Sequence, residues 1–130
     1  MGQNTRSPRV LVVEDEGLMR WSLLQTLAEM GCSVEEAADG DGAIRNLSPG
    51  SGDFDVILLD YQLPDSRDLT LLTALRRLAP RCQIILMTAF GTPDLLKGAI
   101  ELGVYRVLAK PFELRDLAQA VRQAYADRPQ

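Results

Sequence analysis

The sequence contains no histidine and only two cysteines among its 130 residues. Without histidine the chain cannot hold a Ser-His or Cys-His catalytic pair or a His-ligated zinc ion, and it cannot itself be a phosphohistidine donor. Cys32 and Cys82 are far apart and form no CxxC motif, so we expect two ordinary buried or half-buried thiols. Any reactive site must therefore be built from other side chains.

Long apolar segments are also missing. No run approaches the roughly 20 residues needed to cross a bilayer, and the polar N-terminal stretch, residues 1–7, lacks the apolar region of a signal peptide. We therefore expect a cytoplasmic location. The formal net charge of −4 argues against nucleic acid or an anionic membrane as a direct partner. The absence of GxGxxG and GxxxxGK[ST] argues against nucleotide binding.

Five short apolar runs alternate with longer helical patterns. The expected strands are Arg9–Val13, Ser33–Ala37, Phe54–Leu59, Gln83–Met87 and Val104–Leu108. Most of these runs are nearly continuous Val, Ile and Leu, which is typical of parallel strands covered on both faces. The second run is more polar, and we expect it at an edge of the sheet. The expected helices are Gly17–Met30, Asp39–Leu47, Asp68–Leu78, Thr92–Leu102 and Glu113–Tyr125.

This alternation predicts a single α/β domain with a flavodoxin-like (βα)5 fold. The fold is a doubly wound parallel sheet with strand order 2-1-3-4-5, in which right-handed crossovers place helices on both faces. We expect the domain to span residues 9–126. The flanking residues are predicted to form a disordered N-terminal tail over 1–8 and a C-terminal tail, or the start of a linker, over 127–130.

Charged side chains directly follow several of the apolar runs. Glu14 and Asp15 follow the first run, Asp60 follows the third and Lys110 follows the fifth. In an open α/β sheet, ligands bind at the carboxyl ends of the strands. Three carboxylates crowded together would favour protonation unless a cation relieved their repulsion, and oxygen ligands suit a hard divalent ion. The pattern therefore predicts a Mg²⁺ (or Mn²⁺) site held by Glu14, Asp15 and Asp60.

The same cluster suits phosphoryl chemistry. Asp60 could bind the metal through one oxygen and act as a nucleophile through the other, because carboxylates form aspartyl phosphates. The metal and Lys110 would then stabilise charge on the phosphoryl oxygens. Thr88 ends the fourth run, and its hydroxyl and the Ala89 amide could both bind a phosphoryl oxygen.

Four motifs together resemble the receiver domain of bacterial two-component response regulators. They are Glu14-Asp15-Glu16, Leu59-Asp60-Tyr61-Gln62-Leu63-Pro64-Asp65, Met87-Thr88-Ala89 and Lys110-Pro111-Phe112. Each is weak alone, but their order and their positions after strands one, three, four and five make the set specific. The resemblance covers the chain from about Arg9 to Tyr125.

The resemblance implies that Asp60 accepts a phosphoryl group from the phosphohistidine of a sensor kinase or a phosphotransfer protein. It implies that the Gln62 backbone carbonyl joins Glu14, Asp15 and Asp60 around Mg²⁺. It makes Thr88 the switch hydroxyl and Lys110 the cation that pairs with the phosphate. It also implies a cis peptide bond before Pro111.

Finer features resemble the receivers of enhancer-binding activators, which carry an AAA+ ATPase and a DNA-binding domain downstream. The segments concerned are Arg20-Trp21-Ser22-Leu23, Leu63-Pro64-Asp65-Ser66 and Met87-Thr88-Ala89-Phe90-Gly91. We therefore favour an excised domain over a stand-alone receiver. In the family, the fourth helix, fifth strand and fifth helix often pair two receivers or contact an output domain. The expected output surface comprises Leu95, Leu96, Ile100, Tyr105, Arg106 and Arg115.

The chain departs from the family pattern at the switch aromatic. Val107 stands where Tyr or Phe is usual, three residues before Lys110. Tyr105 has the same strand parity, so its ring is expected on the same side, as a displaced substitute or as a packing aromatic. Asp68 stands where glycine is common and is expected to cap the third helix.

Two other functions remain as alternatives to the phosphorylation switch. The missing switch aromatic would suit a pseudo-receiver, which binds other proteins without taking up phosphate. A hydrolase with an aspartyl-phosphate intermediate would need a further acid or base near Asp60, and neither Tyr61 nor Gln62 suits that work at neutral pH. We therefore expect slow self-hydrolysis of phospho-Asp60 and no enzyme activity on a free substrate.

Overall fold

The computed structural model describes residues 7–47 and 53–129. Most of the predicted N-terminal tail, residues 48–52 and Gln130 lie outside this part. The strands are β1 (Arg9–Val13), β2 (Ser33–Ala37), β3 (Val56–Asp60), β4 (Gln83–Thr88) and β5 (Arg106–Ala109). The helices are α1 (Gly17–Glu29), α2 (Gly40–Asn46), α3 (Thr70–Leu78), α4 (Pro93–Glu101) and α5 (Leu114–Ala126).

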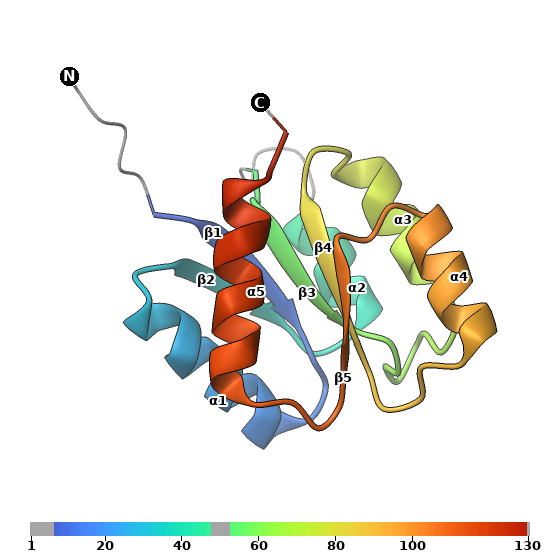
Figure 1. Ribbon diagram of the computed structural model, residues 1–130, viewed down its shortest axis with the longest axis horizontal. Coiled ribbons are helices and arrows are strands. Elements are labelled where there is room, and N and C mark those ends of the chain that lie inside the picture. The colour runs from blue at the N-terminus through green and yellow to red at the C-terminus, as the bar shows by residue number, and fades with distance from the viewer. Residues whose placement is uncertain (1–6, 48–52, 130) are drawn as a thin grey trace.

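The five strands form one parallel sheet in the order β2-β1-β3-β4-β5, which confirms the predicted topology. Helices α1 and α5 cover one face, and α2, α3 and α4 cover the other (Figure 1). The chain therefore forms the three layers expected when every crossover is right-handed.

Alternating side chains of the central strands pack into two separate hydrophobic cores, one on each face of the sheet. Leu11 and Ile57 pack toward α2, α3 and α4, whereas Val12 and Leu58 pack toward α1 and α5. Because both faces of β3 are covered, all five of its residues are buried. In β2 only Ala37 is fully buried, and this confirms its position at the sheet edge.

Capping residues set several of the helix ends. Gly31 has a φ of 88° just after α1, where glycine adopts the left-handed conformation without steric cost. The Thr92 hydroxyl accepts a 3.2 Å hydrogen bond from the Leu95 amide and caps α4 as expected. The prediction for α3 was wrong by two residues, because the helix begins at Thr70 and Leu69 occupies the cap position. Asp68 still accepts a 2.9 Å hydrogen bond from the Thr70 amide.

Two strands end differently from the prediction. Asp60 is the last residue of β3 rather than the residue that follows it, whereas Thr88 ends β4 as expected. In β5 the paired segment starts at Arg106, so Val104 and Tyr105 precede the strand. Within residues 7–47 and 53–129, no helix has the length and apolar character that a membrane span requires.

Candidate functional site

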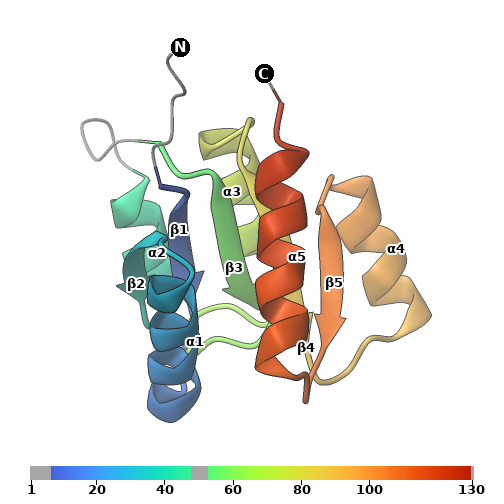
Figure 2. The same ribbon diagram turned by 60° about the vertical axis from the view of Figure 1, so that its left-hand side comes forward.

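The candidate site lies where the carboxyl ends of four strands meet. Figure 2 shows the parallel strands pointing toward one end of the molecule, with the C-terminal end of α5 at the opposite end. Register pairs Val13 of β1 with Leu59 of β3, and Asp60 of β3 with Met87 of β4. Glu14 and Asp60 therefore emerge side by side, and Lys110 enters from the end of β5.

These strand ends open into a cavity of about 420 Å³. Its lining contains four carboxylates, one lysine and one arginine, together with uncharged residues of the loops. The residues are Glu14, Asp15, Glu16, Asp60, Gln62, Leu63, Pro64, Arg67, Ala89 and Lys110. The structure thus brings together the predicted acids, Gln62, Ala89 and Lys110.

Thr88 takes a different position from its neighbours. It is 2% exposed and is absent from the cavity lining. Its hydroxyl oxygen accepts a 3.0 Å hydrogen bond from the Phe90 amide. In this conformation Thr88 therefore orders the turn after β4, while Ala89 reaches the cavity wall. Its role as a switch hydroxyl stays a prediction.

Lys110 links two buried carboxylates. Its Nζ lies 2.8 Å from Glu14 Oε1 and 3.3 Å from Asp60 Oδ1. Glu14 is 1% exposed and Asp60 is 6% exposed, so both charges depend on protein partners. The other Glu14 oxygen accepts a 3.1 Å hydrogen bond from the Glu16 amide. The ammonium group therefore compensates part of the cost of burying two negative charges.

Electrostatics make Asp60 an unusual carboxyl group. Burial, and then the neighbouring Glu14 charge, raise the pKa of Asp60 from 3.8 to about 6, against the opposing effects of Lys110 and the Gln62 amide. Burial favours a lower pKa for Lys110, but its hydrogen bond to Glu14 and the Asp60 charge raise that pKa above the usual value. Lys110 is therefore positively charged at neutral pH, and a further cation would favour ionised Asp60.

The donor set fits a hard divalent ion. One carboxylate oxygen from each of Glu14, Asp15 and Asp60 can be chosen so that all three lie within 4.8 Å of one another. Asp15 is exposed, which leaves the outer side of the cluster open to water, and oxygen ligands with retained waters are what Mg²⁺ prefers. Gln62 lines the same cavity, and its backbone amide donates a 3.4 Å hydrogen bond to Asp60 Oδ1. The role of its carbonyl as a ligand stays a prediction.

Backbone bonds hold the strand ends together. The Lys110 amide donates to the Thr88 carbonyl at 2.8 Å, and the Tyr61 amide donates to the Met87 carbonyl at 2.8 Å. The Lys110–Pro111 peptide bond is cis, as expected.

Sequence reasoning placed part of the proposed output surface incorrectly. Leu95 is only 8% exposed and packs in the core under α4. Ile100 is 67% exposed, and Arg106 and Arg115 are also exposed. Leu96 is half-buried. The exposed part of this surface is therefore smaller than predicted.

Tyr105 does not lie on the side of Val107. Tyr105 packs against the core of α1 and α5, and its hydroxyl donates a 2.7 Å hydrogen bond to Asp127 Oδ2. Val107 packs against the opposite core. The parity argument failed because Tyr105 precedes the paired part of β5. Its environment fits a packing aromatic rather than a substitute for the switch residue.

Two arginines near the site were missed as site residues. Arg20 of α1 donates to the Glu14 carbonyl at 2.8 Å and pairs with Glu36 of β2 at 2.9 Å, which ties the turn after β1 to the neighbouring strand. Arg67 lines the cavity from the loop between β3 and α3. Nothing in the sequence pattern distinguishes either from a solvated surface arginine.

The sequence was compared with known protein families and curated proteins. The response regulator receiver domain matches residues 10–122. The chain is 32% identical over 115 residues to the DNA-binding transcriptional regulator NtrC of Azospirillum brasilense, covering 88% of the chain and 24% of NtrC. It is 36% identical over 119 residues to the transcriptional regulatory protein PdtaR of Mycobacterium tuberculosis, covering 89% of the chain and 56% of PdtaR. The chain thus spans only part of these relatives.

Solved structures share the same architecture. A CheY-like receiver domain protein from Methanospirillum hungatei superposes with a TM-score of 0.87 at 25% identity, covering 93% of this chain and 95% of that chain. The receiver domain of NtrX from Brucella abortus gives a TM-score of 0.80 at 26% identity, covering 91% and 98%. The strand order described above therefore occurs in a fold that is already known.

Proposed function

The chain belongs to the family of response regulator receiver domains, and from this premise we propose that it is a phosphorylation switch of a two-component system. The observation that carries the proposal is the position of Asp60, which lies in an open cavity beside Glu14 and within 3.3 Å of the Lys110 ammonium group. A receiver domain is a signalling domain rather than an enzyme that acts on a free substrate.

In the proposed reaction an Asp60 carboxylate oxygen attacks the phosphorus of a phosphohistidine on a sensor histidine kinase or a phosphotransfer protein. A bond forms between phosphorus and the Asp60 oxygen, and the bond between phosphorus and the imidazole nitrogen breaks. The imidazole leaves with the electron pair. Lys110 and the Ala89 amide stabilise charge on the transferring oxygens. Mg²⁺ or Mn²⁺, held by Glu14, Asp15, Asp60 and the Gln62 carbonyl, supplies further charge neutralisation when bound.

The reverse signal is loss of the phosphoryl group to water. Among the residues that line the cavity, none is a histidine, and Tyr61 and Gln62 beside the nucleophile are poor general bases at neutral pH. Slow autodephosphorylation is therefore part of the proposal. The phosphorylated state would last long enough to be read by another protein or domain.

The output is proposed to be transcription regulation through a domain of a longer parent protein, or dimerisation of the receiver. NtrC and PdtaR are transcriptional regulators by name, and the chain covers only 24% and 56% of their lengths. The net charge of −4 favours regulation by protein contacts over direct binding of nucleic acid by this segment. The exposed residues Ile100, Arg106 and Arg115 are candidates for these contacts.

Intact mass after incubation with Mg²⁺ and acetyl phosphate tests the proposal. The wild type should gain one phosphoryl group, and Asp60→Asn should gain none. Size-exclusion chromatography of the same samples would reveal any change of oligomeric state. If the wild type gains no mass at short times with excess Mg²⁺, the pseudo-receiver becomes the better interpretation, and Val107 is the first residue to exchange.

A further inference from the structure

Arg67 lies at the edge of the candidate phosphorylation site. It is exposed and lines the same cavity as Asp60, Ala89 and Lys110. Lys110 is already hydrogen-bonded to Glu14, whereas the Arg67 guanidinium makes no hydrogen bond or ion pair with any residue in the described part of the chain. Its charge is therefore available to an anion that enters the cavity.

The loop that carries Arg67 is anchored just before this residue. Leu63 and Ser66 exchange backbone hydrogen bonds of 2.8 and 3.2 Å. The Asp65 carboxylate accepts hydrogen bonds from the Gly40 and Asp41 amides, at 2.8 and 3.1 Å, at the start of α2. These bonds hold the residues just before Arg67, so little backbone freedom would be lost when the guanidinium binds a ligand.

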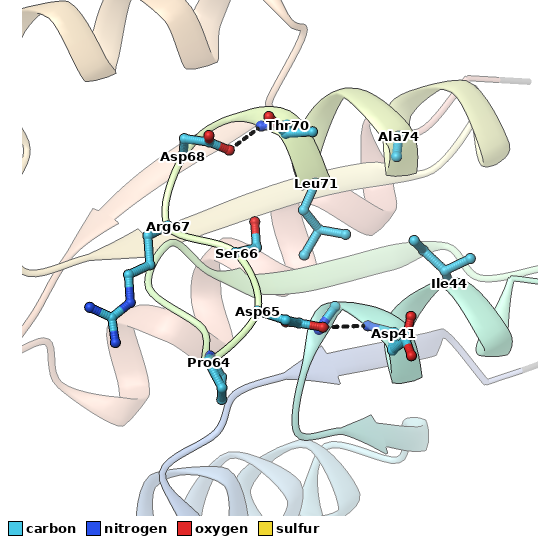
Figure 3. Close-up of a pocket in the computed structure, with 11 residues that line it drawn as sticks. Asp41, Ile44, Pro64, Asp65, Ser66, Arg67, Asp68, Thr70, Leu71 and Ala74 are labelled. Carbon is cyan, nitrogen blue, oxygen red and sulfur yellow. Dashed lines mark hydrogen bonds between the residues drawn. The ribbon is translucent and has the colours of Figure 1, made fainter.

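Arg67 also lines a second hollow of the surface, between α2 and α3. Figure 3 shows Asp65 directed toward Asp41 of α2, while the Arg67 side chain extends to the other side of the loop, away from Leu71 and Ala74. The Arg67 side chain thus points away from the part of this hollow that Leu71 and Ala74 line, and Arg67 also lines the cavity at the strand ends.

Phosphorylation would change the charge that Arg67 faces. A phosphoryl group brings about −1.5 to −2 charges and three acceptor oxygens. A guanidinium offers paired N–H donors that match phosphate oxygens, and it stays charged at every physiological pH. Lys110 also donates a hydrogen bond to Glu14, so it cannot by itself neutralise all three phosphoryl oxygens.

We propose that Arg67 binds the phosphoryl group of phospho-Asp60 and prolongs the phosphorylated state; this inference rests on the proposed function. Hydrolysis requires a water oxygen to bond to phosphorus while the bond from phosphorus to the Asp60 oxygen breaks. The carboxylate leaves with the electron pair, and the water's proton passes to the phosphate product or to solvent. Arg67 is exposed and lines the cavity, so its contact with the phosphoryl group would block one side from which that water molecule could approach.

The test compares Arg67→Ala and Arg67→Lys with Arg77→Ala. Arg77 is an exposed arginine in the last turn of α3, outside the cavity lining, so its replacement removes the same charge elsewhere. Each protein is phosphorylated with acetyl phosphate and Mg²⁺, the donor is removed, and the decay of the phosphorylated mass is followed. Arg67→Ala should shorten the half-life about three- to tenfold, as expected for loss of one charge-assisted contact at an exposed site. Arg67→Lys should be intermediate, and Arg77→Ala should match the wild type.

Beryllofluoride, a phosphoryl analogue, gives a readout that does not depend on turnover. With Mg²⁺ it should raise the thermal midpoint of the wild type, and the rise should be smaller in Arg67→Ala than in Arg77→Ala. Without beryllofluoride, Arg67→Ala should have the same thermal midpoint as the wild type, because Arg67 is exposed and makes no hydrogen bond or ion pair within the described residues.

The outcomes separate the two proposals. A wild type that accepts phosphate, with an unchanged or longer half-life in Arg67→Ala, overturns the role of Arg67 alone. A wild type that takes up neither phosphoryl mass nor beryllofluoride overturns both the proposed function and the role of Arg67. An equal shortening in Arg67→Ala and Arg77→Ala would assign the effect to net charge and reject a specific contact.

Discussion

Lys110 donates a 2.8 Å hydrogen bond to Glu14, a residue 96 positions earlier in the chain. The two residues follow β5 and β1, and the strands between them are β3 and β4. The lysine side chain therefore reaches across the strand ends and passes Asp60 on the way, at 3.3 Å. One cation thus holds both buried carboxylates of the candidate site.

Replacing Lys110 with methionine should destabilise the metal-free protein by about 1–3 kcal/mol at pH 7, because buried carboxylates lose their cation. The loss should be smaller at pH 5, because Asp60 is then largely protonated and no longer adds a buried negative charge beside Glu14. Urea denaturation at both pH values measures this. Lys110→Arg, which keeps the charge, should retain more of the stability. If Lys110→Met loses the same stability at both pH values, the loss comes from packing of the lysine side chain and not from its charge.

Asp60→Asn should stabilise the metal-free protein at neutral pH. The folded protein holds the Asp60 proton up to about pH 6, whereas the unfolded chain releases it near 3.8. The folded state therefore binds more protons between these values, and wild-type stability falls as pH rises through that window. This rise in the pKa of Asp60 corresponds to at most about 3 kcal/mol in the free energy of unfolding. We expect a gain of about 1–3 kcal/mol for Asp60→Asn at pH 7 that disappears near pH 4, measured by denaturation across that range.

Mg²⁺ affinity should weaken as pH falls below about 6, because protons compete with the metal for Asp60. Asp15→Asn should weaken Mg²⁺ binding about 10- to 100-fold with little effect on stability, since the side chain is exposed and lies in the acidic cluster. Isothermal titration calorimetry checks both expectations. Glu101→Gln, an exposed acid at the end of α4, is the matched control and should bind Mg²⁺ as the wild type does. If Asp15→Asn binds with unchanged affinity, Asp15 is not a ligand.

Thr88 offers a test of its structural role. Thr88→Ser keeps the hydroxyl that accepts from the Phe90 amide and should change stability by less than about 0.5 kcal/mol. Thr88→Val removes the acceptor while keeping the shape, and should cost about 1–3 kcal/mol because a part-buried amide loses its partner. Thermal and urea denaturation measure the difference. Equal stabilities for the two variants would show that the Phe90 amide finds water instead.

Tyr105→Phe should lower stability slightly, as measured by urea denaturation, because it removes one exposed hydrogen bond to Asp127. Asp127→Asn retains an acceptor and should lose less. Hydrogen bonding to Asp127 raises the pKa of the Tyr105 hydroxyl, so this contribution is present at neutral pH and is lost as pH rises above the ordinary tyrosine range. Phosphorylation of Asp60 by acetyl phosphate should be unchanged in Tyr105→Phe. Loss of phosphorylation in Tyr105→Phe would instead support Tyr105 as a substitute for the switch aromatic.

The sequence supported the sheet and the charged cluster because both depend on local patterns. Continuous apolar runs mark strands covered on both faces, and a charge directly after such a run lies at a strand end. Glu14, Asp60 and Lys110 were found in this way. Leu95 and Tyr105 were misplaced because exposure depends on which helix covers which strand, and strand parity applies only to residues within the paired segment.

From sequence alone follow the single α/β domain, its strand order and the residue types at the strand ends, since periodicity and chain order restrict the ways in which parallel strands can be covered. Only the tertiary structure revealed that Lys110 bonds Glu14 as well as Asp60, that the Thr88 hydroxyl is engaged by Phe90, and that Arg67 faces the same cavity. Lys110, Glu14 and Arg67 come from separate loops, so their positions depend on the packing of the sheet and helices that carry them. The Thr88–Phe90 contact is local, and it depends on the conformation of the turn after β4.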